Sequence, residues 1–144
     1  MLQGLILTEQ TVRCAVRILS ETDGKKTIFT SEGRLSRLQG GVRLTYPMEN
    51  SLVTLETGEE GVSMRREGDV CLRLRFCAGV CTAGEIGLSR DTAGKVSVFS
   101  AKVESFLTEE NVELKKLTIL LEYVLSFPGG ADEAVKLRLT AERK

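Results

Sequence analysis

Three polar side chains with the chemistry to hold a ligand lie in stretches where apolar and polar residues alternate. Alternation places Tyr46, Arg66 and Tyr123 on the apolar side of their stretches. A guanidinium beside tyrosine hydroxyls can hold a carboxylate through two charge-assisted hydrogen bonds. The alternative is that Arg66, which lies just before a turn, points to water or to loop carbonyls at the rim of the fold, because charged groups are seldom fully buried. The two tyrosines would then be ordinary core aromatics with satisfied hydroxyls.

Other groups that carry chemistry in enzymes are scarce. The chain has no histidine, so the usual general base near neutral pH and the Ser-His-Asp and Cys-His arrangements are missing. It also lacks a phosphate-binding loop of the Gly-rich, Lys-Ser/Thr type. Glu85, Glu104 and Glu122 could meet in space, but carboxylates on strands are more often solvated. The sequence therefore predicts no catalytic residue, no cofactor and no enzyme activity.

The four cysteines are Cys14, Cys71, Cys77 and Cys81. Structural zinc sites usually take two closely spaced pairs of ligands, and only Cys77 and Cys81 have such a spacing. We expect four reduced thiols, most of them buried as small hydrophobes, and no metal site. A redox-active Cys71 or Cys77 beside neighbouring arginines is the alternative, because positive charge lowers a thiol's pKa.

Arginines also gather on the opposite side of one pair of stretches. Arg65, Arg73 and Arg75 share that side and could bind an acidic partner. Glu67 and Asp69 dilute their charge, so the interpretation we favour is a solvated outer face.

The overall composition excludes some classes of partner. The chain has 144 residues, with 20 basic and 20 acidic side chains that cancel, so no net field draws in nucleic acid or an anionic membrane. Its longest apolar runs are far shorter than the about 20 residues that cross a bilayer. The first ten residues lack a basic leader, and we expect a protein that stays in the cytoplasm.

The elements that must position these side chains are stretches that alternate with a period of two. Glycine-containing turns separate many of them, which is typical of β-strands joined by tight turns. The clearest alternation ends at Phe76, which shares its side with other apolar residues and belongs to a predicted hairpin. The pattern predicts strands over 12–19, 27–38 with a bend near Gly33, 42–46, 52–57, 61–66, 69–78, 82–88, 95–106, 114–127 and 135–141.

The stretch 114–127 fits both the two-residue period of a strand and the 3.6-residue period of a helix. As a strand it places Leu117, Ile119 and Leu121 on one side, followed by Tyr123. As a helix it would present a polar stripe but leave apolar residues around most of its circumference. We therefore predict a strand, which forms a hairpin with 135–141.

Strands that neighbour one another in sequence form an antiparallel meander. A twisted sheet of so many strands tends to curl and close, since closure removes exposed edges. The predicted fold class is all-β: a single closed antiparallel up-and-down β-barrel of about 8–10 strands. We predict one domain over residues 1–144, with 1–10 as a less regular segment or a first strand.

Three runs of the sequence resemble a bacterial family. GVSMRREGDVCLRLRF, SEGRLSRLQGGVRLTYPME and LTILLEYVLSFPGG are similar to the family typified by YwiB, a domain of unknown function described as calycin-like. The resemblance implies a closed barrel of the lipocalin and fatty-acid-binding-protein type and brings no established activity. The family's tyrosine would fall on Tyr46, its Arg-x-Gly turn on Arg66 and Gly68, and its later phenylalanine on Phe76. The run EIGLSRDTAG departs from the family's pattern of a tyrosine and a threonine before a glycine turn.

These observations lead to two main hypotheses of function. The first is a non-enzymatic calycin-like barrel that binds a small apolar or amphipathic molecule, such as a carboxylate, in its lumen through Tyr46, Arg66, Phe76 and Tyr123. The alternative is a protein-interaction or structural module, such as a homodimer, whose barrel is filled by its own side chains. An enzyme that uses carboxylates or thiols alone is a distant third. The first two differ in whether the lumen is empty or packed, and the large supply of inward apolar side chains favours packing.

Overall fold

Ten antiparallel strands close into one barrel in the computed structural model, which describes residues 11–88 and 93–144. The predicted all-β, closed up-and-down barrel is confirmed, with a strand number at the upper end of the prediction. The segment 1–10 lies outside the described residues. The strands are β1 (Thr11–Thr22), β2 (Lys25–Leu38), β3 (Gly41–Met48), β4 (Ser51–Gly58), β5 (Gly61–Gly68), β6 (Cys71–Phe76), β7 (Cys81–Gly87), β8 (Gly94–Glu110), β9 (Glu113–Ser126) and β10 (Asp132–Arg143).

Every strand pairs with its neighbours in the chain, and β1 pairs with β10 to complete the wall. The stretch that fitted both periods is strand β9, as predicted, and it pairs along its length with β8 and β10. Its alternate side chains from Leu117 to Leu125 are buried. Burial on one side of a strand explains why the apolar residues follow a period of two.

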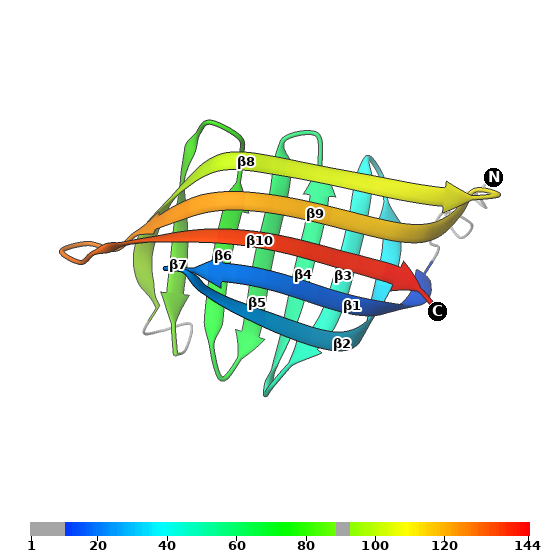
Figure 1. Ribbon diagram of the computed structural model, residues 1–144, viewed down its shortest axis with the longest axis horizontal. Helices are drawn as coiled ribbons and strands as arrows, with labels where there is room; N and C mark the ends of the chain where they lie inside the picture. Colours follow the sequence, from blue (N-terminus) through cyan, green and yellow to red (C-terminus); the bar gives the residue numbers. More distant parts are fainter. Residues whose placement is uncertain (1–10, 89–92) are drawn as a thin grey trace, which may run out of the picture.

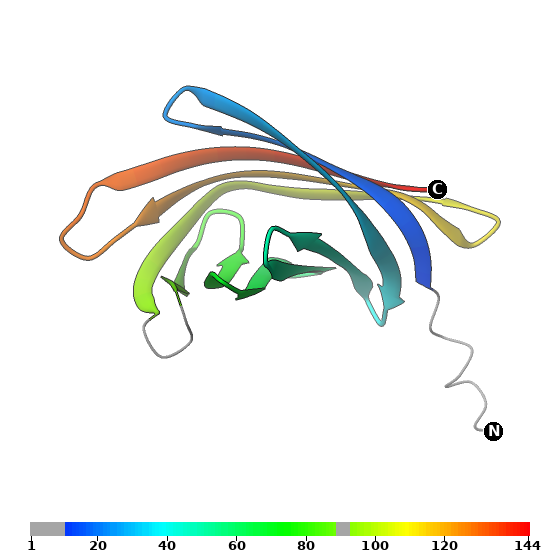
Figure 2. The ribbon, with the colours of Figure 1, turned by 90° about the horizontal axis from the view of Figure 1, so that it is seen from below.

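The barrel is flattened into two layers. Strands β1, β2, β8, β9 and β10 have 12 to 17 residues, whereas β3 to β7 have six to eight. Figure 1 shows the long strands running across the short ones. Seen from below, the long layer arches over the short layer, and its hairpin ends extend past it (Figure 2). The long layer therefore presents a broad outer face.

Gly33 marks the point where β2 gains its second neighbour. Before this residue β2 pairs with β1 alone, and from Arg34 onward it also pairs with β3. A Cβ atom at position 33 would lie 2.5 Å from the carbonyl oxygen of Thr45, so only glycine allows the two strands to approach here. The glycine at which the sequence predicts a bend is thus where β2 joins the short layer.

Side chains of the two layers meet inside the barrel. The rings of Phe76, in the short layer, and Tyr123, in the long layer, have centroids 4.6 Å apart. The rings of Phe29 and Tyr46 make a second contact between the layers, at 6.0 Å. Around them lie side chains with less than 2% of their surface exposed: Leu35, Leu44, Leu55, Leu114, Leu117, Ile119, Leu121, Leu139, Val16, Val98 and Cys14. The chain's own residues fill the space between the layers.

Candidate functional site

The four residues predicted to bind a ligand all point inward. Tyr46, Phe76 and Tyr123 are buried, and the side chain of Arg66 is 18% exposed. Tyr46 and Arg66 are neighbours in the barrel wall, because both pair with Val53 of the strand between them. Phe76 and Tyr123 form the ring contact between the layers. The structure thus brings these residues together in two pairs.

Arg66 lies at the end of the barrel where the β3–β4 and β5–β6 turns are found. Its position therefore agrees with the alternative from the sequence, in which Arg66 lies at the rim of the fold. Its Nε donates a hydrogen bond to Ser51 Oγ at 2.6 Å, and its guanidinium lies 3.5 Å from a carboxylate oxygen of Asp69. Ser51 Oγ in turn donates to the carbonyl oxygen of Met48 at 2.7 Å. The charge of Arg66 therefore has partners within the protein.

The tyrosine hydroxyls in this region keep their protons at neutral pH. Burial raises the pKa of Tyr46, and the nearby Arg66 charge opposes that shift without cancelling it. Burial, followed by the charge of Glu133, raises the pKa of Tyr123 to about 12. Because both hydroxyls are already protonated at neutral pH, neither side chain is suited to take up a proton from a substrate.

The three carboxylates considered in the sequence do not form one cluster. Glu104 and Glu122 are diagonal neighbours on the outer side of β8 and β9, where Lys102 is the register partner of Glu122 and lies 3.9 Å from Glu104, whereas Glu85 lies on β7. All of the cysteines are free; Cys14 is buried and Cys81 is exposed. No group of three His, Cys, Asp or Glu residues able to hold a metal occurs within 11–88 and 93–144. In the same ranges there is no helix with the length and apolar character to cross a membrane.

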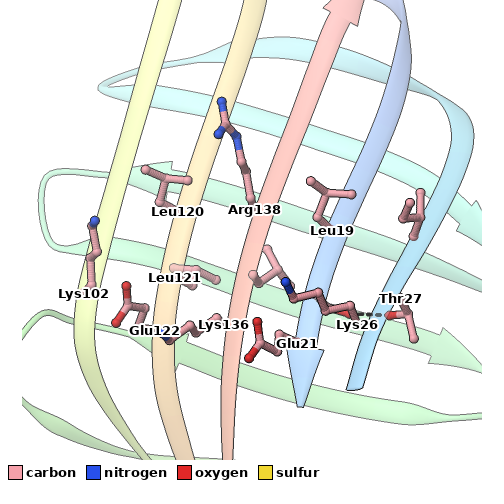
Figure 3. A pocket seen from close by; sticks show the side chains of 13 residues that line it. Leu19, Glu21, Lys26, Thr27, Lys102, Leu120, Leu121, Glu122, Lys136 and Arg138 are labelled. Carbon is pink, nitrogen blue, oxygen red and sulfur yellow. Dashed lines mark hydrogen bonds between the residues drawn. The ribbon is translucent and has the colours of Figure 1, made fainter. Parts of the chain in front are cut away.

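The outer face of the long layer carries a groove that sequence analysis missed. Figure 3 shows it from outside, with side chains from β8, β9, β10, β1 and β2 around it. Its volume is about 390 Å³. Leu19, Ile28 and Leu120 line it, and Ile28 is 64% exposed. Arg138 lies in the same cross-strand row, between Leu19 and Leu120. We call this feature the outer groove.

A row of alternating charges borders the outer groove. The register places one charged residue from each of the five strands side by side, and the signs alternate along the row. We call this set the charge row: Lys26, Glu21, Lys136, Glu122 and Lys102. Figure 3 shows these side chains on the face of the groove. Among the residues that the structure describes, only Lys102 of the row forms an ion pair, 3.9 Å from Glu104.

One signal in the sequence pointed to the outer groove. Leu19, Ile28 and Leu120 occupy positions where a simple alternation would place polar residues. The charge row had no such signal, because its members lie far apart in the sequence and only the strand register joins them. A single sequence does not contain that register.

Comparison with known proteins gives one match in structure. No family model matches the chain, and no curated protein sequence does. The crystal structure of the YwiB protein from Bacillus subtilis superposes with a TM-score of 0.73 and 20% sequence identity, covering 100% of this chain and 99% of that one. The chain shares the fold of YwiB. The resemblance seen in the sequence is therefore confirmed at the level of fold, and the calycin relationship stays a prediction.

Proposed function

We propose that the protein is a non-enzymatic interaction module, and that a second copy of the same chain binds to the outer face of its long layer. The barrel is the scaffold, since its interior is filled by its own side chains. The observation that carries this proposal is the charge row beside the outer groove. Of the two main hypotheses from the sequence, this one agrees better with a packed lumen.

Four members of the charge row, all except Lys102 at its end, are complementary to their own copies. A two-fold axis that runs along the strands between β10 and β1 reverses the strand order of the second copy. This operation sets Glu21 of one copy opposite Lys136 of the other, and Glu122 opposite Lys26. Each of these contacts occurs twice, as isologous interfaces require. Opposite charges across an interface favour this register over shifted ones.

The same operation covers the apolar side chains of the outer groove. In the next row along the strands, Leu120 of one copy faces Ile28 of the other. Ile28 is 64% exposed in the single chain, so the contact removes apolar surface from water. Apolar groups beside a border of charges are typical of protein interfaces.

The face that this axis covers is close in size to one side of a stable interface. Four strands, β9, β10, β1 and β2, overlap with their copies; at a spacing of about 4.8 Å they span about 19 Å, and strands of 12 residues extend about 40 Å. Their product is about 760 Å² for each copy, compared with about 800 Å² for each partner in a typical stable interface.

Sedimentation equilibrium tests the proposal. We expect wild-type protein to sediment with twice the chain's mass of 15.8 kDa. Glu21→Lys should shift the protein to monomer, and Glu21→Lys combined with Lys136→Glu should restore the dimer, because the exchange keeps opposite charges across the axis. Glu59→Lys, a charge reversal in the exposed β4–β5 turn, is the matched control and should leave the dimer unchanged. A wild-type monomer at every concentration, or a double variant no better than the single one, contradicts the proposal.

A second candidate function is the binding of a small amphipathic carboxylate in the outer groove. It is favoured by Arg138, which places a guanidinium between the apolar side chains of Leu19 and Leu120. Native mass spectrometry of protein purified from its host would detect such a ligand. Arg138→Ala should abolish its retention, while Arg66→Ala at the barrel rim should not. Protein that carries no small molecule argues against this candidate.

A further inference from the structure

We propose that the outer face of β5 to β8 binds an acidic peptide segment in extended conformation. This face belongs to the short layer and the adjoining start of β8, so the inference is independent of the proposed dimer. Arg65, Arg73 and Arg75 project from it, and Lys95 completes a cluster of four cations. Sequence analysis favoured a solvated face here, and these side chains are indeed exposed. The structure also shows hollows among them.

Two adjoining hollows form a trough along β6. One has a volume of about 310 Å³ and extends past Cys71 toward Arg66. The other has a volume of about 450 Å³ and extends past Arg75 toward Lys95. Arg73 and Glu85 line both hollows. An elongated trough fits a segment of chain better than it fits a single small ion.

The trough has a cause in the strand pairing. The ladder between β6 and β7 covers only Cys71 to Arg73, so regular pairing ends at the Arg73–Glu85 pair. Gly84, the next residue of β7, is buried on the inner side, where a Cβ atom would lie 2.8 Å from Leu74 Cδ2. The next outward-facing residue of β7 is Ala83, whose side chain is small. Little side-chain volume therefore covers the outer side of the wall where the ladder ends.

The cations of the trough have few partners in the protein. Arg65 and Arg73 are directly opposite each other on adjacent strands, an arrangement of like charges that is unfavourable by itself. Arg65 lies 3.2 Å from Glu67. Arg73, Arg75 and Lys95 form no ion pair within the described part of the chain, although Glu85 is the register partner of Arg73 and Lys95. Four cations against two carboxylates leave a local excess of positive charge.

The spacing of the arginines matches an extended peptide with acidic side chains at every second residue. Arg73 and Arg75 are two residues apart on one strand, so their positions differ by about 7 Å. Carboxylates at every second residue of an extended peptide repeat with the same spacing and can each accept two hydrogen bonds from a guanidinium. A nucleic acid is less suitable, because no aromatic side chain lines the trough to stack on bases.

Titration with two synthetic peptides tests this inference. The probe is N-acetyl-Glu-Ser-Glu-Ser-Glu-amide, and the reference peptide has glutamine in place of each glutamate. In low salt, amide resonances of β5 to β8 should shift with the probe and not with the reference. The double variant Arg73→Ala/Arg75→Ala should weaken binding of the probe at least tenfold. The affinity of Arg73→Lys/Arg75→Lys should lie between that of the alanine variant and that of the wild type, because lysine keeps the charge but cannot donate two parallel hydrogen bonds to one carboxylate.

The chain offers a matched control. Arg13 and Arg34 are a second pair of arginines directly opposite each other on an outer face, but Glu32 lies 3.4 Å from Arg13. Arg13→Ala/Arg34→Ala should leave the affinity for the probe unchanged. The inference is overturned by any of three results: no shift with the probe, equal weakening in the control variant, or inorganic phosphate binding at the same residues as tightly as the peptide. Unfolding of each variant by circular dichroism shows that the fold is retained.

Discussion

Removal of the Phe76 ring is the most direct test of the filled barrel. Phe76 is fully buried and contacts Tyr123 across the layers. In a packed interior, Phe76→Ala removes the ring from its contacts and leaves a cavity, which costs about 3–5 kcal/mol. The contact with another ring adds to burial alone, so we expect a value of about 4–5 kcal/mol.

Urea denaturation, followed by circular dichroism, measures this change. The free energy of unfolding falls with a slope of about 2 kcal/mol for each molar of urea in a typical small protein. A loss of about 4 kcal/mol in this free energy therefore lowers the urea concentration at the unfolding midpoint by about 2 M. The slope should stay the same, because both proteins expose nearly the same surface on unfolding. Phe106→Ala is the control, since this ring lies on the outer side of β8 and is 54% exposed. The control should cost less than about 1 kcal/mol.

A lumen open to water or to a ligand predicts a different result. The Phe76 ring would then line an existing space, and its removal would enlarge that space without breaking a packed contact. The cost would fall to that of a partly exposed residue, below about 1.5 kcal/mol. A value in that range refutes the filled barrel and restores the lumen as the ligand site.

Four other properties can be predicted from single residues. Ser100 Oγ is buried and has no hydrogen-bond partner among the described residues, so Ser100→Ala should raise the free energy of unfolding by about 1 kcal/mol in urea. Val112 has a φ of 58°, which a β-branched residue disfavours, so Val112→Gly should add about 0.5–1 kcal/mol in the same assay. Burial raises the pKa of Tyr46 and that of Tyr123, the latter to about 12. Stability that is present below the unfolded-state pKa near 10 should therefore be lost as pH rises from about 10 to 12, by up to about 1.4 kcal/mol per pH unit for each tyrosine, as measured by urea melts across that range. Burial also raises the pKa of the Cys14 thiol, and mass spectrometry should show that iodoacetamide modifies Cys14 only when the chain unfolds.

Three of these predictions have a control in the chain. Ser97→Ala, at an exposed position of the same strand as Ser100, should change stability by less than about 0.5 kcal/mol. The double variant Tyr46→Phe/Tyr123→Phe should keep more of its stability at alkaline pH than the wild type does. Exposed Cys81 should react with iodoacetamide at once in the folded protein. A destabilised Ser100→Ala variant would show that the buried hydroxyl does not lower the stability of the wild type. Equal losses of stability at alkaline pH in the wild type and the double variant would show that burial of the tyrosines does not cause the alkaline loss.

The strands could be predicted because burial on one side imposes a period of two. This signal is strongest in β9, where alternate residues are buried from Leu117 to Leu125. The helix alternative fails for the same physical reason: both neighbours of β9 pair with it and need an extended backbone. The inward direction of Tyr46 and Arg66 followed from the same period.

Some turns could not be predicted, because they lack the residues that usually mark them. The sequence suggested a strand over 95–106 and another from 114, but β8 continues to Glu110 and a two-residue turn follows. Asn111 and Val112 both have positive φ angles there, a conformation usually found with glycine. Val112 gave no signal of a turn, so the long overhang of the β8–β9 hairpin was missed.

The filled interior fixes the geometry of the outer surfaces. Ring contacts such as that of Phe76 with Tyr123 fix the distance between the layers, and paired strands fix the spacing within each layer. Charges on the outer faces are therefore held at regular separations without a rearrangement on binding, which lowers the entropy lost when a partner docks. An open lumen would allow the wall to flex, and the distances between the residues of the charge row would then vary. A packed barrel thus favours functions performed on its outside, and a variant that loosens the core should weaken self-association even though no residue of the interface has changed.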